Sequence, residues 1–105
     1  MAGRSLEYHR RAEHYMALAD MAKTDEERAN HQRIAAEFEM ECFDDISVDK
    51  PRTRGIVAIS ACALYLHSGD VDEADHCARV FIADETMPEW ARLDLQKFLK
   101  EASLA

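Results

Sequence analysis

Residues 55–67 read GIVAISACALYLH, and this stretch decides the fold. It carries no charged side chain over more than three helical turns, so a helix formed here has no face to offer solvent and is predicted to be buried. The flanks favour helix over strand, because Pro51 suits a first turn and Gly69 suits the left-handed residue that ends a helix. The stretch is too short to cross a bilayer, which takes about 20 residues. We therefore predict a central helix within a small all-α domain.

Length and composition indicate one helical domain that spans residues 1–105. A chain of 105 residues is long enough for one hydrophobic core and too short for two. It contains only 3 glycines and 2 prolines, and this scarcity favours helices joined by short turns. Hydrophobic residues make up 48% of the chain and charged residues 32%, a balance typical of folded domains rather than of disordered chains.

The net charge and the cysteines indicate which kinds of partner and which cellular compartment to expect. The formal net charge is -8, and a negative field repels phosphate backbones and anionic lipid, so we expect no nucleic-acid partner and no membrane partner. The N-terminal residues lack the apolar segment of a signal peptide, which favours the cytoplasm. The cysteines, Cys42, Cys62 and Cys77, show no C-x-x-C spacing, so we expect reduced and buried thiols.

Periodicity predicts two helices before the central one. The first is expected over residues 6–23, with an apolar face made of Tyr8, Ala12, Tyr15, Met16, Ala19 and Ala22. Thr24 and Glu27 then form the pattern of a capping box, which starts the second helix. That helix is expected over residues 25–43, and its core side is expected to hold Ile34, Ala35, Phe38, Cys42 and Ile46.

Two further helices are predicted after the central one. Gly69 and Asp70 indicate a tight turn, with Asp70 as the cap of a helix over residues 71–83. The buried face of this helix is expected to hold Ala74, Cys77, Ala78, Phe81 and Ile82. Thr86 and Pro88 mark the start of a fifth helix. Its inner side is expected to hold Trp90, Ala91, Leu95, Phe98, Leu99 and Ala102.

Two charge clusters flank the loop before the central helix, and each has the wrong sign for the dipole of its helix. The acidic cluster ends the second helix and consists of Glu37, Glu39, Glu41, Asp44 and Asp45. The basic cluster, Lys50, Arg52 and Arg54, opens the central helix. One interpretation is that the basic cluster closes over the acidic one as a partly exposed salt-bridge network. The other is that it forms, with the free amides of the helix start, a site for an anion or a peptide carboxylate.

Residues 65–74, YLHSGDVDEA, resemble the middle of a tetratricopeptide repeat, in which a tyrosine precedes a small-residue turn and an acidic helix start. Ala74 matches the small residue of the second helix of the repeat, Tyr65 its tyrosine, and Cys62 the small residue of its first helix. The chain departs from the pattern at Ala58, where the family often has tryptophan. The resemblance implies five antiparallel helices, arranged as two repeat-like helical hairpins and a C-terminal capping helix.

The same resemblance implies a protein-interaction module that binds a protein or peptide partner. In that family the first helices of the repeats line the binding groove, and the corresponding positions of the first helix here include Arg11, His14 and Leu18. In the central helix these positions are apolar apart from His67, so a clamp for a C-terminal carboxylate is not expected. If a peptide binds, we expect an apolar helix or strand with some negative charge near Arg11 and Arg54.

Catalytic and metal-binding patterns are weak, and we interpret the chain as a non-enzyme without a metal or other cofactor. Glu73 and His76 have the i, i+3 spacing of dimetal helical bundles, but the second Glu-x-x-His of such a site is missing. Cys62 lies in the most apolar helix, whereas a nucleophile needs access to substrate and a neighbouring base. The chain contains no Gly-rich phosphate loop, no H-E-x-x-H and no G-x-S-x-G.

Self-association is the alternative function. Trp90 lies beside Met87 and Leu93, and an exposed patch there would serve as a partner surface or as a homodimer interface. The candidate binding residues are therefore Arg11, His14, Leu18, Lys50, Arg52, Arg54 and Trp90.

Overall fold

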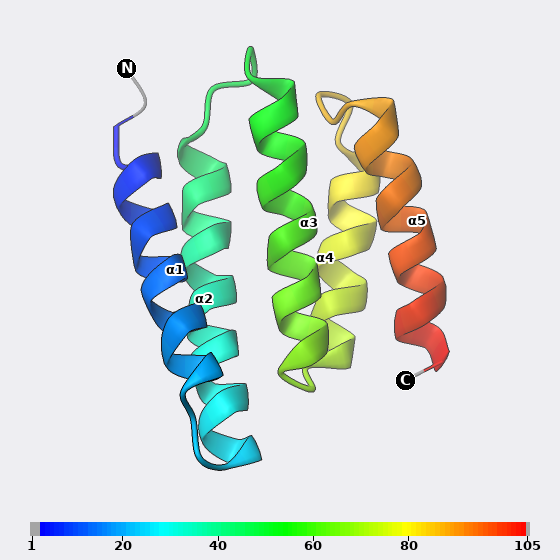
Figure 1. Ribbon diagram of the computed structural model, residues 1–105. Helices are drawn as coiled ribbons and strands as arrows, with labels where there is room; N and C mark the ends of the chain where they lie inside the picture. The colour runs from blue at the N-terminus through cyan, green and yellow to red at the C-terminus, as the bar shows by residue number, and fades with distance from the viewer. Residues whose placement is uncertain (1–2, 105) are drawn as a thin grey trace.

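The computed structural model describes residues 3–104 and contains five α-helices (Figure 1). They are α1 (Ser5–Asp20), α2 (Asp25–Asp45), α3 (Pro51–His67), α4 (Val71–Ala83) and α5 (Glu89–Leu104). No strand occurs in this described part of the chain. The predicted all-α class and the five helices are confirmed. The largest difference in the helix ends is at α1, which ends at Asp20 rather than at residue 23.

The helices form two layers, with α1, α3 and α5 in one and α2 and α4 in the other (Figure 1). Each helix packs against the next in the chain and runs in the opposite direction, and α3 also packs against α5. By contrast, no Cα atom of α1 lies within 8 Å of one in α3. The domain is therefore a slab of 40 × 35 × 16 Å, in which the first hairpin is joined to the rest through α2 and α3.

Small side chains dominate the core. Ten of the 22 buried apolar residues are alanines, and these let neighbouring helix backbones approach closely. Phe43 of α2 and Phe81 of α4 supply the main aromatic contact, with ring centroids 4.7 Å apart. The three cysteines are buried and unpaired, as predicted. Burial raises the pKa of Cys42 to about 11 and those of Cys62 and Cys77 to about 12, so all three thiols are neutral.

The turns that set the helix ends follow the sequence closely. The amide of Glu27 donates to Thr24 Oγ1 at 3.1 Å, which confirms the capping interaction at the start of α2. Gly69 ends α3 with φ of +88°, a conformation that glycine adopts without a side-chain clash. Asp70, predicted to cap α4, does not do so. Its carboxylate accepts instead from Arg33 Nε of α2 at 2.7 Å and from the Ser68 hydroxyl at 2.8 Å.

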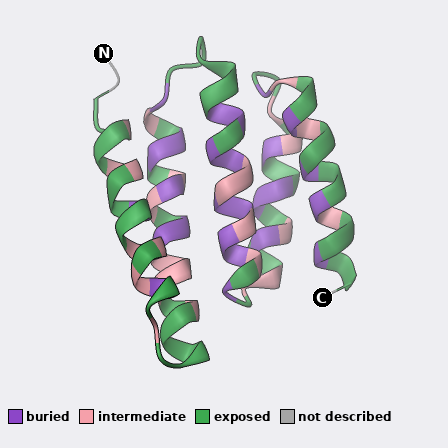
Figure 2. Cartoon of the chain, viewed as in Figure 1, coloured by how far each residue is buried: buried purple, intermediate pink, exposed green. Residues whose placement is uncertain are grey.

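The central helix α3 is less buried than its composition suggests. Leu64 is buried and Ile59 is half-buried, but Ile56 remains 51% exposed, so the predicted lack of any solvent face is wrong. Figure 2 shows buried and exposed stretches alternating along α3. The cause is the layering, because α3 is covered by α2, α4 and α5 while the side toward α1 is left without a helix contact. Within residues 3–104, no helix has the length and hydropathy needed to cross a membrane.

Candidate functional site

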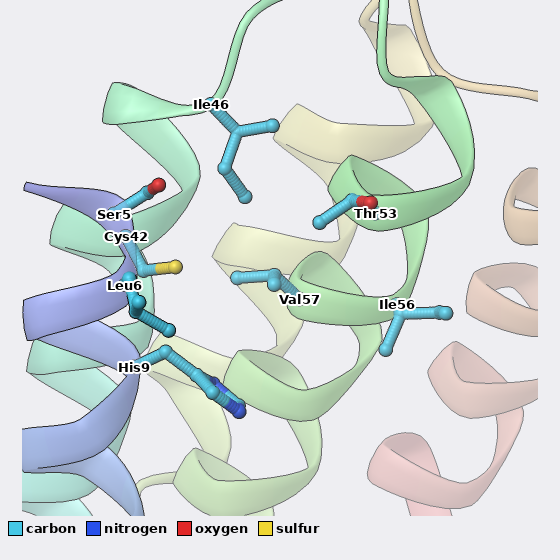
Figure 3. Close-up of a pocket in the computed structure, with 8 residues that line it drawn as sticks. All are labelled: Ser5, Leu6, His9, Cys42, Ile46, Thr53, Ile56 and Val57. Carbon is cyan, nitrogen blue, oxygen red and sulfur yellow. The ribbon is translucent and has the colours of Figure 1, made fainter. Parts of the chain in front are cut away.

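The gap between α1 and α3 contains an apolar cavity of about 270 Å³ (Figure 3). It is lined by Ser5, Leu6 and His9 of α1, by Cys42 and Ile46 from α2 and its end, and by Thr53, Ile56 and Val57 of α3. We call this cavity the central hollow. Figure 3 shows side chains from α1 and α3 projecting into it from opposite sides. A space of this kind, bounded by three helices, is a common place for a ligand in a helical protein.

Two large apolar side chains on the walls of the central hollow are open to solvent. Leu6 is 60% exposed and Ile56 is 51% exposed, while Cys42, Ile46 and Val57 beneath them are buried. Isolated apolar residues on a surface need no explanation, but two of them at one cavity make this cavity a candidate interaction site. Sequence reasoning missed Leu6, because it lies outside the apolar stripe of α1. Ile56 is one of the central-helix positions that the resemblance assigns to a groove, but the apolar stretch around it predicted a helix without a solvent face.

A buried carboxylate, that of Glu39, contacts His9, which lines the central hollow. Glu39 of α2 is only 1% exposed, and its Oε1 atom lies 3.0 Å from His9 Nδ1. The other imidazole nitrogen of His9 lies 3.8 Å from Glu13 Oε1. The sequence had placed Glu39 in the acidic cluster at the end of α2, but its side chain is buried and does not belong to a surface cluster. Its contact holds the His9 ring in position at the cavity wall, since a buried carboxylate needs a partner.

Two further hollows adjoin the central one. The first lies on α1 and is lined by Gly3, Leu6, Glu7, Arg10, Arg11 and His14. The second lies between α3 and α5 and is lined by Arg52, Ile56 and Trp90. Leu6 belongs to the central hollow and the α1 hollow, and Ile56 belongs to the central hollow and the α3–α5 hollow. The three hollows therefore form one row across α1, α3 and α5, which we call the groove.

The structure brings some of the predicted site residues to the groove. Arg11 and His14 line the α1 hollow, as does Glu7, which pairs with Arg11 at 2.5 Å. Arg11 also lies 5.8 Å above the ring of Phe38, so part of its charge is already engaged. Leu18, near the end of α1, lines none of the three hollows.

Arg54 was predicted to be a binding residue, but its side chain is buried and forms contacts within the protein. Its guanidinium donates to the Ile46 carbonyl at 2.7 Å and lies 4.2 Å from the ring centroid of Phe43, at the end of α2. It also approaches Asp84 at 3.5 Å and Thr86 at 3.4 Å, in the turn between α4 and α5. Arg54 therefore ties the end of α2 to the second hairpin and is not free to meet a ligand.

The predicted network between the basic and acidic clusters is absent from the described residues. Lys50 and Arg52 are exposed, and neither forms an ion pair with a residue in the range 3–104. The carboxylate of Asp45 accepts instead from the backbone amide of Arg4, at the start of α1. Because α1 and α2 are antiparallel, the positive end of one helix dipole meets the acidic end of the other. The acidic end of α2 thus has a partner that the sequence did not reveal.

Trp90 lies at a close contact between α5 and α3. A β-carbon added to Gly55 would come within 3.0 Å of two Trp90 ring atoms and of the Ala91 β-carbon, so glycine permits this contact. Trp90 is still 42% exposed and Leu93 is 51% exposed, whereas Met87 is buried. The exposed part of the expected patch therefore consists of Trp90 and Leu93.

The central hollow contains few ionisable groups. Within residues 3–104, no three or more histidine, cysteine, aspartate or glutamate side chains gather closely enough to hold a metal ion. Cys42 in the central hollow has a pKa of about 11, raised mainly by burial, so it is a poor nucleophile at neutral pH. His9 is the one titratable side chain among the polar groups that line the central hollow besides this thiol. No family model, curated protein or solved structure matches this chain.

Proposed function

We propose that this protein is a non-catalytic interaction module, similar to a tetratricopeptide-repeat protein, which binds a partner peptide in the groove across α1, α3 and α5. The observation that carries the proposal is the apolar central hollow with two solvent-open walls, Leu6 and Ile56. Burying such side chains against a partner contributes about 25 cal/mol for each Å² removed from water. The proposal places the protein in the cytoplasm, where its neutral thiols would stay reduced.

The repeat-like character of the proposal is supported by the second hairpin. Cys62 and Ala74 are fully buried or nearly so, and Tyr65 is buried beside them, at the positions where the family uses small residues and a tyrosine. The pKa of Tyr65 is raised to about 12, mainly by burial, which fits a structural role for its ring. In addition, the odd-numbered helices share one layer, and the groove lies on that layer.

A peptide-display experiment tests the proposal. A library of random peptides is selected against the wild-type protein, and the selected peptides are then measured on Ile56→Glu, which places a charge in both hollows that Ile56 lines. The matched control is Val80→Glu, because Val80 is equally exposed but lies on α4, in the other layer. We expect peptides that bind the wild type and the control and lose binding to Ile56→Glu. Peptides that bind all three proteins equally would refute the groove as the site.

Homodimer formation is the second candidate function, favoured by the exposure of Trp90 and Leu93 at the start of α5. Two copies joined through this surface would bury both side chains, and large aromatic residues often dominate such contacts. Sedimentation equilibrium at increasing protein concentration tests this candidate. A dimer that is dissociated by Leu93→Glu would support it, and a monomer at all concentrations would exclude it.

A further inference from the structure

We propose that the occupant of the groove is an acidic amphipathic α-helix of a partner protein. This inference rests on the proposed function and adds the chemistry of the partner. It follows from three features: the distribution of charge between the two layers, the free cations beside the groove, and the lack of a strand edge in its lining.

Charge is strongly segregated between the layers. The helices α2 and α4 together carry eleven acidic and three basic side chains, whereas α1, α3 and α5 carry six acidic and seven basic ones. The net negative charge of the chain therefore resides on the layer that faces away from the groove. A negatively charged partner is repelled by the α2 and α4 layer and meets a neutral to basic surface at the groove, which orients its approach.

Unpaired cations lie at both ends of the row of hollows. Arg10 lines the α1 hollow next to Leu6, and Arg52 lines the α3–α5 hollow next to Ile56. Neither arginine forms an ion pair with another described residue, although the chain has a large excess of carboxylates. The two exposed apolar side chains thus lie between two free guanidinium groups. A ligand with apolar residues in the middle and carboxylates toward its ends complements this order.

The lining of the groove favours a helix over an extended strand. The central hollow exposes mainly apolar side chains, and the elements that surround it are all helices. An extended segment would find no strand edge to pair with, so its buried amide and carbonyl groups would lose their hydrogen bonds to water without replacement. A helix satisfies these groups within itself and presents only side chains, as in other helix-in-groove complexes.

The test uses the peptides selected on the wild-type protein from a library in which glutamate and lysine are equally frequent. We expect the peptides that fail to bind Ile56→Glu to be enriched in glutamate and aspartate and to gain helical circular dichroism in the complex. Neutralising both free cations, in Arg10→Gln with Arg52→Gln, is expected to weaken their binding roughly threefold to tenfold at low salt. The matched control is Arg28→Gln with Arg79→Gln, which makes the same change in net charge on α2 and α4 and is expected to leave binding unchanged or only slightly weaker.

The outcomes separate this inference from the proposed function. If the groove-dependent peptides are neutral or basic, or if the two double variants weaken binding equally, the acidic partner is refuted while the interaction module stands. If no selected peptide depends on Ile56, the proposed function fails and the inference with it. If the protein alone dimerises and Ile56→Glu dissociates the dimer, the occupant is a second copy, and the acidic helix is again refuted.

Discussion

Replacing Arg54 with alanine is expected to cause a large loss of stability, because this buried arginine joins three parts of the chain. The variant loses a charged hydrogen bond to the Ile46 carbonyl at 2.7 Å, a bond of a type that contributes about 1.5–3 kcal/mol. It also loses the guanidinium contact with Phe43 at 4.2 Å, which contributes about 1 kcal/mol or more. Asp84 keeps its hydrogen bonds from Thr86 and is partly exposed, so the loss of its ion pair adds little. The total is about 2.5–4 kcal/mol.

Urea and thermal unfolding, followed by circular dichroism, measure this loss. For a domain of this size, 3 kcal/mol corresponds to a decrease in Tm of roughly 12 °C or more. The control is Arg52→Ala, two residues away and exposed, which should change stability by less than about 0.5 kcal/mol. Because the bonds of Arg54 are buried, the loss should persist at about 1 M salt, where exposed ion pairs are screened. If Arg54→Ala and Arg52→Ala lowered the stability equally, or if the loss in Arg54→Ala disappeared at high salt, the structural role of the buried Arg54 contacts would be refuted.

Three other substitutions test the remaining contacts. His9→Ala leaves the buried carboxylate of Glu39 without its partner, so unfolding in urea should show a loss of about 1–3 kcal/mol, which Glu39→Leu in the same chain should largely recover. Gly55→Ala adds a methyl group against the start of α5; despite about 1 kcal/mol of improved helix propensity, Tm should fall and the tryptophan fluorescence should shift. The pKa of Asp70 is lowered, mainly by the hydrogen bond that its carboxylate accepts from Arg33 of α2. The ionised carboxylate therefore stabilises the fold at pH values above the pKa that Asp70 has in the unfolded chain. Asp70→Asn should therefore be less stable than the wild type at pH 7, and the difference should shrink as the pH falls below about 4, whereas a constant difference would contradict this sign.

The helices and their turns could be predicted from the sequence because their determinants are local. Thr24 caps α2 within three residues, and Gly69 ends α3 through its own φ angle. Apolar periodicity likewise identified the stripes of α4 and α5, where residues such as Ala74 and Leu95 are buried as expected. Each of these features depends on residues within one or two helical turns, so a single sequence contains the information.

The site could be predicted only in part, because it depends on contacts between distant segments. Arg54 looked like a member of an exposed basic cluster, yet the end of α2 and the turn after α4 come together around it. Glu39 looked like one of several surface acids, and only the antiparallel pairing of α1 with α2 brings His9 to it. Ile56 is exposed because α1 does not contact α3, and the pattern of apolar residues along one helix contains no information about this separation. Arg11 and His14, which the resemblance assigns to the groove face of the first helix, line the α1 hollow, and their contact with a partner stays a prediction.

The alanine-rich core gives this domain an uneven tolerance of mutation. Ala58 and Ala78 are fully buried and have only a methyl group to lose, whereas an added carbon at such a position would have to displace its packed neighbours. Random substitution should therefore eliminate variants mainly through enlargement, and surviving lineages should keep glycine, serine or cysteine at these points. Selection for small volume, more than for hydrophobicity, would then be the signature by which distant descendants of this chain are found.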